Sequence, residues 1–432
     1  MKKSSSISLL TVTAIVVANM IGAGIFTSLG FQLVSTVNTW SILILWSLGA
    51  LMALCGALSY AELGTYWMRS GGEYNFLSKA YHPLLGYLSG WASLTIGFAA
   101  PVALSGMALG EYVAPYLNVS KMGLAIGVVI SVSFFHSMSL KRSSLLQDTT
   151  TILKVALILV FIAFGLYYKP EASAFLFNDS WKSEILLPGF AVSFVYVSYS
   201  YLGWNAAAYI TDEIKDARKN LPKALLIGTF IVSVLYILLT LVFLKHNPLS
   251  ELQGQLEVGQ ITAVSLFGSK GGEWVSFGIA LLLISSISAM IWSGPRVTQV
   301  MAEDHSLWQW FSNKKNDIPV RTIWLQTAIT LFLLITGSFE QVMIYSSFVL
   351  QLFAALAVAG VFVVRKQKKK HTGFKSPLFP VPQLLFLIFS VWVLVYLLIA
   401  QPLESGLGLL NLVIGAGVYS FDRWVGRKKT EG

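Results

Sequence analysis

The feature that most constrains this chain is a series of long apolar stretches that recurs along the whole sequence. A stretch of about 20 apolar residues is long enough to cross a bilayer as a helix. Only 12% of the residues are charged and 55% are hydrophobic, whereas roughly a quarter of the residues of a soluble domain are charged. The sequence therefore predicts an all-α membrane protein and excludes soluble enzymes and nucleic-acid binders. The twelve predicted transmembrane helices are residues 7–33, 39–66, 84–113, 122–139, 145–168, 187–212, 221–246, 272–300, 321–336, 340–364, 381–399 and 405–423.

The positive charges are distributed unequally between the two sides of this predicted bundle. Most of the 30 Lys and Arg residues fall in segments that would share the side of the N-terminus, for example the run from Arg365 to Lys370. Cytoplasmic loops carry such an excess in membrane proteins. We therefore expect a multi-pass protein of the cell membrane, embedded in the lipid bilayer, with both termini cytoplasmic. The same distribution explains the net charge of +10 without a nucleic-acid partner.

Two of the predicted helices, the first and the sixth, contain glycine near their middles. Residues 19–26 read NMIGAGIF and residues 199–205 read YSYLGWN. Because these helices are five apart, an odd number, the second five-helix unit would be inverted, as in transporters that bind substrate at the membrane midplane. Small residues that only allow close helix packing would explain one such helix, but the matched pair favours transport. The predicted units are a five-helix repeat at 1–168, an inverted five-helix repeat at 187–364, helices 11 and 12 at 381–423 and a cytoplasmic tail at 424–432.

Helix breaks inside a membrane expose backbone groups that lipid cannot satisfy. Unwinding at Gly22 to Gly24 would free N–H donors, and the positive dipole end of the following helical segment would favour a carboxylate there. Carbonyl groups freed at Tyr199 to Leu202 would accept from an ammonium group. A ligand that carries both charges on one carbon is an α-amino acid. The residues predicted to bind it are Ile21, Gly22, Ala23, Gly24, Tyr199, Ser200, Leu202 and Gly203.

Lys154 is an ionisable residue in the middle of the fifth predicted helix, about 14 Å into a core about 30 Å thick. A lysine at that depth costs on the order of 2.5 to 3.5 kcal/mol, which favours a functional role over a structural one. No other Lys, Arg, Asp or Glu is expected at comparable depth. Tyr236 could donate to a carbonyl of the sixth helix, but we expect it simply to pack. Carbonyls of the first helix are the expected partners of the lysine, together with one or more of the hydroxyls of Ser285, Ser286 and Ser288.

Several motifs resemble those of a known family. The segment IGAGIF at 21–26 resembles a signature of the amino acid–polyamine–organocation superfamily, and the segments at 60–65 (YAELGT) and 70–74 (SGGEY) resemble its signature after the second helix. The motifs occur in the expected order through the first ten helices. The chain most resembles the bacterial alanine–serine–cysteine exchangers of the L-type amino acid transporter branch. The matches to this branch are YLGWN at 201–205, EIK at 213–215, NLP at 220–222 and GPR at 294–296.

This resemblance implies a LeuT-like fold and sodium-independent exchange of small neutral L-amino acids, such as alanine, serine and cysteine, by alternating access. It implies that Tyr199 covers the substrate and that Leu202, which stands where members with large substrates have glycine, limits substrate size. Lys154 resembles the lysine that occupies the place of a sodium ion between helices 1 and 8. The alternative is a proton-coupled symporter in which Lys154 carries the proton. Residues 114–121 lack the cysteine that bonds a heavy subunit in animal relatives, so we expect no covalently linked partner.

Enzymatic chemistry, a metal site and a cofactor are not expected. The chain has one cysteine, Cys55, which excludes a disulfide framework and a multi-thiolate metal site. An intramembrane enzyme would need a second acid or a histidine set at the depth of Lys154, where the sequence offers only serines. We therefore expect a transporter rather than an enzyme.

Overall fold

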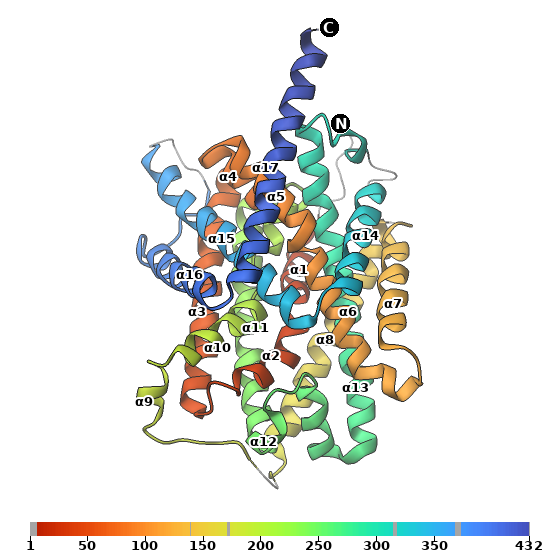
Figure 1. Cartoon of the computed structure of the whole chain (residues 1–432), viewed down its shortest axis with the longest axis vertical. Coiled ribbons are helices and arrows are strands. Elements are labelled where there is room, and N and C mark those ends of the chain that lie inside the picture. Colours follow the sequence, from red (N-terminus) through yellow and green to blue (C-terminus); the bar gives the residue numbers. More distant parts are fainter. Residues whose placement is uncertain (1–6, 139, 171–172, 314–317, 368–372, 432) are drawn as a thin grey trace.

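The computed structural model of this chain describes residues 7–138, 140–170, 173–313, 318–367 and 373–431 as a bundle of helices (Figure 1). These ranges contain no β-strand, only isolated bridge residues, among them the parallel bridge between Ile7 and Ile214. The helices are α1 (Leu9–Met20), α2 (Gly24–Gln32), α3 (Thr39–Tyr66), α4 (Glu73–Ala80), α5 (Pro83–Ala92), η1 (Ser93–Gly97), α6 (Ala99–Leu117), α7 (Lys121–His136), α8 (Leu140–Tyr167), α9 (Trp181–Glu184), α10 (Pro188–Ser200), η2 (Ala206–Glu213), α11 (Ala217–His246), α12 (Leu249–Leu252), α13 (Val258–Asp304), η3 (Gln309–Phe311), α14 (Val320–Thr336), α15 (Phe339–Lys366), α16 (Val381–Ala400) and α17 (Pro402–Glu431).

These helices confirm the all-α membrane architecture. By length and composition, nine spans among the described residues are long and apolar enough to cross a membrane. α7 and α14 are shorter apolar helices, and the remaining predicted span, 187–212, is divided between α10 and η2. The number of twelve crossings and the division into two inverted repeats stay predictions.

The predicted helix bounds agree well with α3 and α14, but α13 is much longer than the predicted span 272–300. A helical segment begins at Val258, and it joins the predicted span across a kink at Gly268, whose φ of +71° and ψ of −178° are not helical. Val258 and Ala263 are buried, so tertiary packing supports the added turns.

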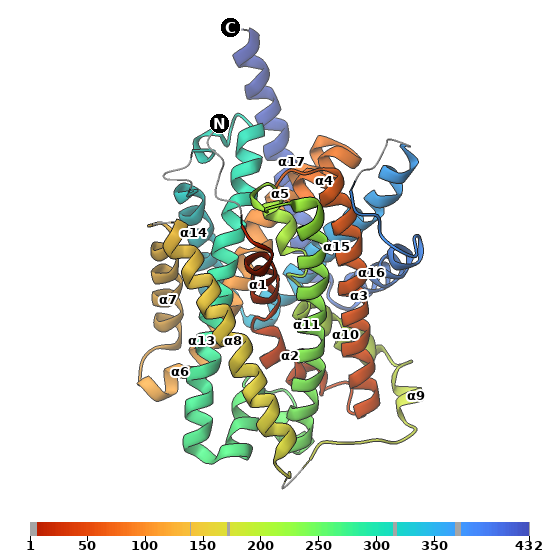
Figure 2. The ribbon, with the colours of Figure 1, turned by 180° about the vertical axis from the view of Figure 1, so that it is seen from behind.

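The two halves of the broken first helix, α1 and α2, lie in the centre of the bundle. Figures 1 and 2 show them enclosed, with α3 and α16 on one flank and α7 on the opposite flank. α11 packs against both α1 and α3, and α13 packs against α6 and α8. The first break therefore lies in the interior of the bundle, where Ile21 and Ala23 are buried.

Both ends of the described chain lie at the same end of the bundle. The Ile7 N–H donates to the carbonyl oxygen of Glu213 at 2.8 Å, and the Glu213 carboxylate pairs with Arg296 of α13 at 2.8 Å. His305, directly after α13, contacts Asp422 of α17 at 2.8 Å. The start of α1 and the end of α17 are thus gathered around the end of one helix. Which side of the membrane they face stays a prediction.

Candidate functional site

The first helix is interrupted where the sequence predicted it. α1 ends at Met20 and α2 begins at Gly24. The Gly22 N–H donates to Met20 O at 2.9 Å and closes a tight turn, so this donor is already used. The first N–H groups of α2 have no acceptor within their own helix, and they lie at its positive dipole end. The donors that remain for a ligand are therefore at Ala23 and the start of α2.

The sixth predicted helix is also interrupted as predicted. α10 ends at Ser200, Gly203 adopts φ +101°, and η2 begins at Ala206. The carbonyl of Tyr199 accepts from the Leu202 N–H at 3.0 Å, which means that the break frees fewer carbonyls than the sequence suggested. The carbonyls available to a ligand therefore lie beyond Tyr199.

The two breaks lie directly against each other, and glycine is required at the contact. A Cβ atom on Gly24 would lie 2.8 Å from the Cα of Ser200, and one on Gly203 would lie 2.7 Å from the carbonyl carbon of Asn19. The hydroxyls of Ser28 and Ser200 lie 2.8 Å apart across the same contact. Glycine at positions 24 and 203 therefore allows the two segments to pack closely, in addition to allowing the helix breaks that the sequence suggested.

Tyr236 of α11 joins the two breaks through its hydroxyl group. The hydroxyl lies 2.6 Å from Met20 O, at the end of α1, and 3.0 Å from Ser200 O, at the end of α10. The sequence had led us to expect simple packing at this position. The side chain does pack against Trp46 and Tyr201, but its hydroxyl also satisfies backbone carbonyls on both sides.

A cavity of about 50 Å³ lies beside the breaks. Asn19 comes from the end of α1, Leu202 and Gly203 from the break after α10, and Met290 from α13. Leu202, predicted to limit substrate size, thus lines this space. Glu73 also lines it, although the sequence had placed this residue in a motif between two helices and no ionisable group other than Lys154 was expected in the interior.

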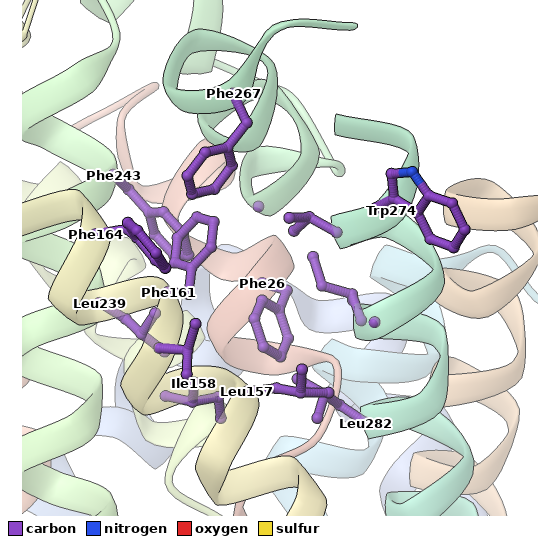
Figure 3. Close-up of a pocket in the computed structure, with 15 residues that line it drawn as sticks. Phe26, Leu157, Ile158, Phe161, Phe164, Leu239, Phe243, Phe267, Trp274 and Leu282 are labelled. Atoms are coloured by element: carbon purple, nitrogen blue, oxygen red, sulfur yellow. The ribbon is translucent and has the colours of Figure 1, made fainter. Parts of the chain in front are cut away.

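A second cavity, of about 260 Å³, lies behind α2 (Figure 3). Phe26 of α2 points into it, and the rings of Phe161 and Phe164 of α8, which contact Phe267, also line it. Its lining side chains are aliphatic or aromatic, so it offers little to the charged ends of an amino acid. The polar cavity beside Leu202 is therefore the better candidate for a substrate.

Comparison with known proteins decides the family. The sequence pattern of the amino acid permease family matches residues 7–418. The chain belongs to the amino acid permease family. The resemblance to the amino acid–polyamine–organocation superfamily that its motifs indicated is therefore confirmed.

Named relatives of this permease are similar over nearly its whole length. The serine/threonine exchanger SteT of Bacillus subtilis (strain 168) is 29% identical over 424 residues, which cover 96% of this chain and 95% of that protein. The cystine/glutamate transporter of Homo sapiens is 28% identical over 96% of this chain and 84% of its own length. The b(0,+)-type amino acid transporter 1 of Homo sapiens is 29% identical over 96% of this chain and 87% of its own length.

Lys154 of this permease lies beside the first break and is fully buried. Its Nζ donates to Ile21 O at 2.7 Å, to the Ser286 hydroxyl at 2.8 Å and to Ala18 O at 3.3 Å. Three acceptors match the three hydrogens of an ammonium group. The lysine thus connects α8, α1 and α13.

Of the three serines considered as partners of the lysine, only Ser286 makes the contact. Ser285 is buried, and its hydroxyl has no hydrogen-bond partner among the described residues. Ser288 instead lies 2.8 Å from Nε2 of His136. The three serines are spread around α13, and only one faces the break.

The end of the permease where its two termini gather is closed by ion pairs. Glu62 of α3, which is buried, pairs with Arg365 at 2.7 Å. Arg69 pairs with Asp304 at 2.8 Å, next to the Arg296–Glu213 pair. These pairs connect α3 with α15, and α13 with η2 and with the segment after α3.

Proposed function

We propose that this permease exchanges small neutral L-amino acids, such as alanine, serine and cysteine, across the cell membrane by alternating access and without sodium. The observation that carries the proposal is the position of Lys154, whose ammonium group bridges the first break and α13. The termini would be cytoplasmic, on the side rich in Lys and Arg.

The geometry of the two breaks supports an α-amino acid as the substrate. The N-terminal end of α2 offers N–H donors and a positive dipole end to a carboxylate. The break between Ser200 and Ala206 offers carbonyl oxygens to an ammonium group at short range, because Gly24 and Gly203 let the two segments touch. The names of the relatives add support, since two of them are an exchanger of serine and threonine and a transporter of cystine and glutamate.

The oxygen atoms around Lys154 support independence from sodium. Two backbone carbonyls and one hydroxyl surround Nζ, and such oxygens are also what a hard cation would bind. With a lysine among them, the positive charge is built into the chain. All three ammonium hydrogens have acceptors, and these contacts stabilise the charged form of the lysine.

Two further features support the substrate size and the subunit composition. Leu202 fills part of the space beside the breaks, which favours small side chains. Cys55, the single cysteine of the sequence, is buried inside α3, where a partner chain could not reach it to form a disulfide. We therefore propose that the permease acts without a covalently linked heavy subunit.

A liposome experiment tests the function directly. Purified protein is reconstituted, and uptake of labelled alanine is measured with and without serine inside, with and without sodium, and with an imposed pH gradient. We expect uptake only when internal amino acid is present, with no effect of sodium. Uptake into empty vesicles that follows the pH gradient would replace exchange with proton symport.

A further inference from the structure

The carboxyl group of Glu73 is a buried acid beside the candidate substrate site. Glu73 is the first residue of α4, and its side chain is only 6% exposed. Backbone bonds hold the preceding segment against η2, because the Gly71 N–H donates to Tyr209 O at 3.1 Å and the Gly72 N–H to Ala208 O at 3.2 Å. The start of α4 is thus held against η2, and the acid lies in the interior.

The two oxygens of this carboxyl group have different environments. Oε1 accepts hydrogen bonds from Asn205 Nδ2 at 2.6 Å, from the Tyr60 hydroxyl at 2.7 Å and from the Tyr209 hydroxyl at 3.1 Å. Oε2 is buried and has no hydrogen-bond partner in the described part of the chain. One oxygen is fully satisfied, and the other needs a donor or must itself become one.

A second unsatisfied acceptor faces the same cavity. Asn19 uses Nδ2 to donate to Ile15 O at 2.7 Å, while its Oδ1 is buried without a partner. Asn19 and Glu73 both line the cavity of about 50 Å³, which is large enough to hold a bridging water molecule. A proton on Oε2 of Glu73 would turn this acceptor into a donor, for example to a water molecule in the cavity.

The charged groups on the elements around Glu73 are engaged elsewhere. Arg69 pairs with Asp304, and Arg296 pairs with Glu213. Lys79 lies on α4 itself but is exposed, Arg365 of α15, which packs against α4, pairs with Glu62, and Lys154 donates to carbonyls of α1. An ionised carboxylate in such a place, without a cation, is unfavourable because it has lost its hydration. In agreement, burial raises the pKa of Glu73, and the hydrogen bonds from Tyr60, Tyr209, Asn205 and the backbone only partly offset this effect.

We propose that Glu73 is a proton-binding site of this permease, protonated while the cavity is closed as in this structure and ionised when water enters it. The proposal rests on the proposed exchange function, because alternating access is the motion that would let water enter and leave the cavity. The proton stabilises the closed cavity at low pH, and this stabilisation is lost as the pH rises through the raised pKa. The titrating group of this proposal is thus Glu73 and not Lys154.

The test is the pH profile of exchange for Glu73→Gln, which imitates the protonated acid. Labelled alanine is exchanged for internal serine in proteoliposomes with the same pH on both sides. Because the proton stabilises the closed cavity, it should slow the opening that exchange requires. We therefore expect the wild-type exchange rate to rise with pH, by up to about tenfold per pH unit within the titration range of Glu73. At every pH, Glu73→Gln should exchange alanine as slowly as the wild type does at low pH.

A matched control is Glu340→Gln. Glu340 also accepts from a tyrosine, since the Tyr196 hydroxyl donates to it at 2.9 Å, but Glu340 is exposed and lies outside the cavity. It should keep the wild-type profile. A Glu73→Gln profile that rises like that of the wild type would overturn the proposal.

A second measurement does not depend on transport. Infrared difference spectra of the purified protein, recorded across the same pH range, should contain the carbonyl band of a protonated carboxylic acid that Glu73→Gln lacks and Glu340→Gln keeps. If no such band is lost, Glu73 is not the proton site even if exchange occurs. If the band is lost but alanine uptake needs no internal amino acid, the proton site stands and the exchange function fails.

Discussion

Replacing Lys154 with methionine removes the charge but keeps a side chain of similar length. In the wild type, Nζ lies 2.7 Å from Ile21 O and 2.8 Å from the Ser286 hydroxyl, which itself lies 2.6 Å from Ile21 O. In Lys154→Met the carbonyl at the first break retains only the Ser286 hydroxyl. The variant thus weakens the connection between α1 and α13 that we propose holds the break in its binding geometry.

The magnitude follows from these contacts. A hydrogen bond to a charged group contributes about 1.5 to 3 kcal/mol, and the contact with Ala18 O, at 3.3 Å, is the weakest of the three. If one such bond no longer supports the binding-competent break, the apparent affinity for alanine falls by about 10- to 150-fold. Insertion should not suffer, because a lysine near the membrane centre costs about 2.5 to 3.5 kcal/mol that methionine avoids.

The assay is exchange of labelled alanine for internal serine over a range of alanine concentrations. Ser285→Ala is a matched control, since Ser285 precedes the Lys154 partner on α13 and its hydroxyl has no hydrogen-bond partner among the described residues. We expect a raised KM for Lys154→Met, a normal KM for Ser285→Ala and normal yields of both proteins. A Lys154→Met protein whose KM equals that of the wild type would refute the role given to the lysine.

Three further predictions test the size limit, the connection between the breaks and the topology. Leu202→Gly should allow leucine to compete with labelled alanine, because Leu202 lines the cavity beside the breaks, and an unchanged competition profile would reject its role. Tyr236→Phe, which loses the hydroxyl contacts at 2.6 and 3.0 Å, should raise the KM by about twofold to tenfold, and an unaltered KM would show that packing alone matters. Single cysteines at Asn118 and Lys366, in a Cys55→Ala background, should react with an impermeant maleimide from opposite sides of the membrane. Reaction of both cysteines from one side would contradict the predicted topology.

The sequence by itself determined the helical membrane architecture and the places where helices break. A backbone in lipid must satisfy its own hydrogen bonds, so long apolar stretches are restricted to helices, and this constraint acts locally. The breaks at 21–23 and 201–205 were predictable for the same reason, because glycine in matched helices marks where the backbone departs from the helix. The depth of Lys154 also followed from counting along one helix.

Only the tertiary structure decided which side chains meet. Ser285, Ser286 and Ser288 lie within about one turn of α13, where successive residues differ by about 100° around the axis. The rotation of α13 against α1, which turns Ser286 toward Lys154, depends on the packing of the whole bundle. Glu73 shows even more clearly that the sequence alone does not predict which side chains meet. Its local sequence indicates a connection between helices, and it is buried because η2, more than 100 residues later, folds against it. Contacts between segments so far apart in the chain leave no periodic pattern in either one, so the proton-binding site proposed at Glu73 became visible only in three dimensions.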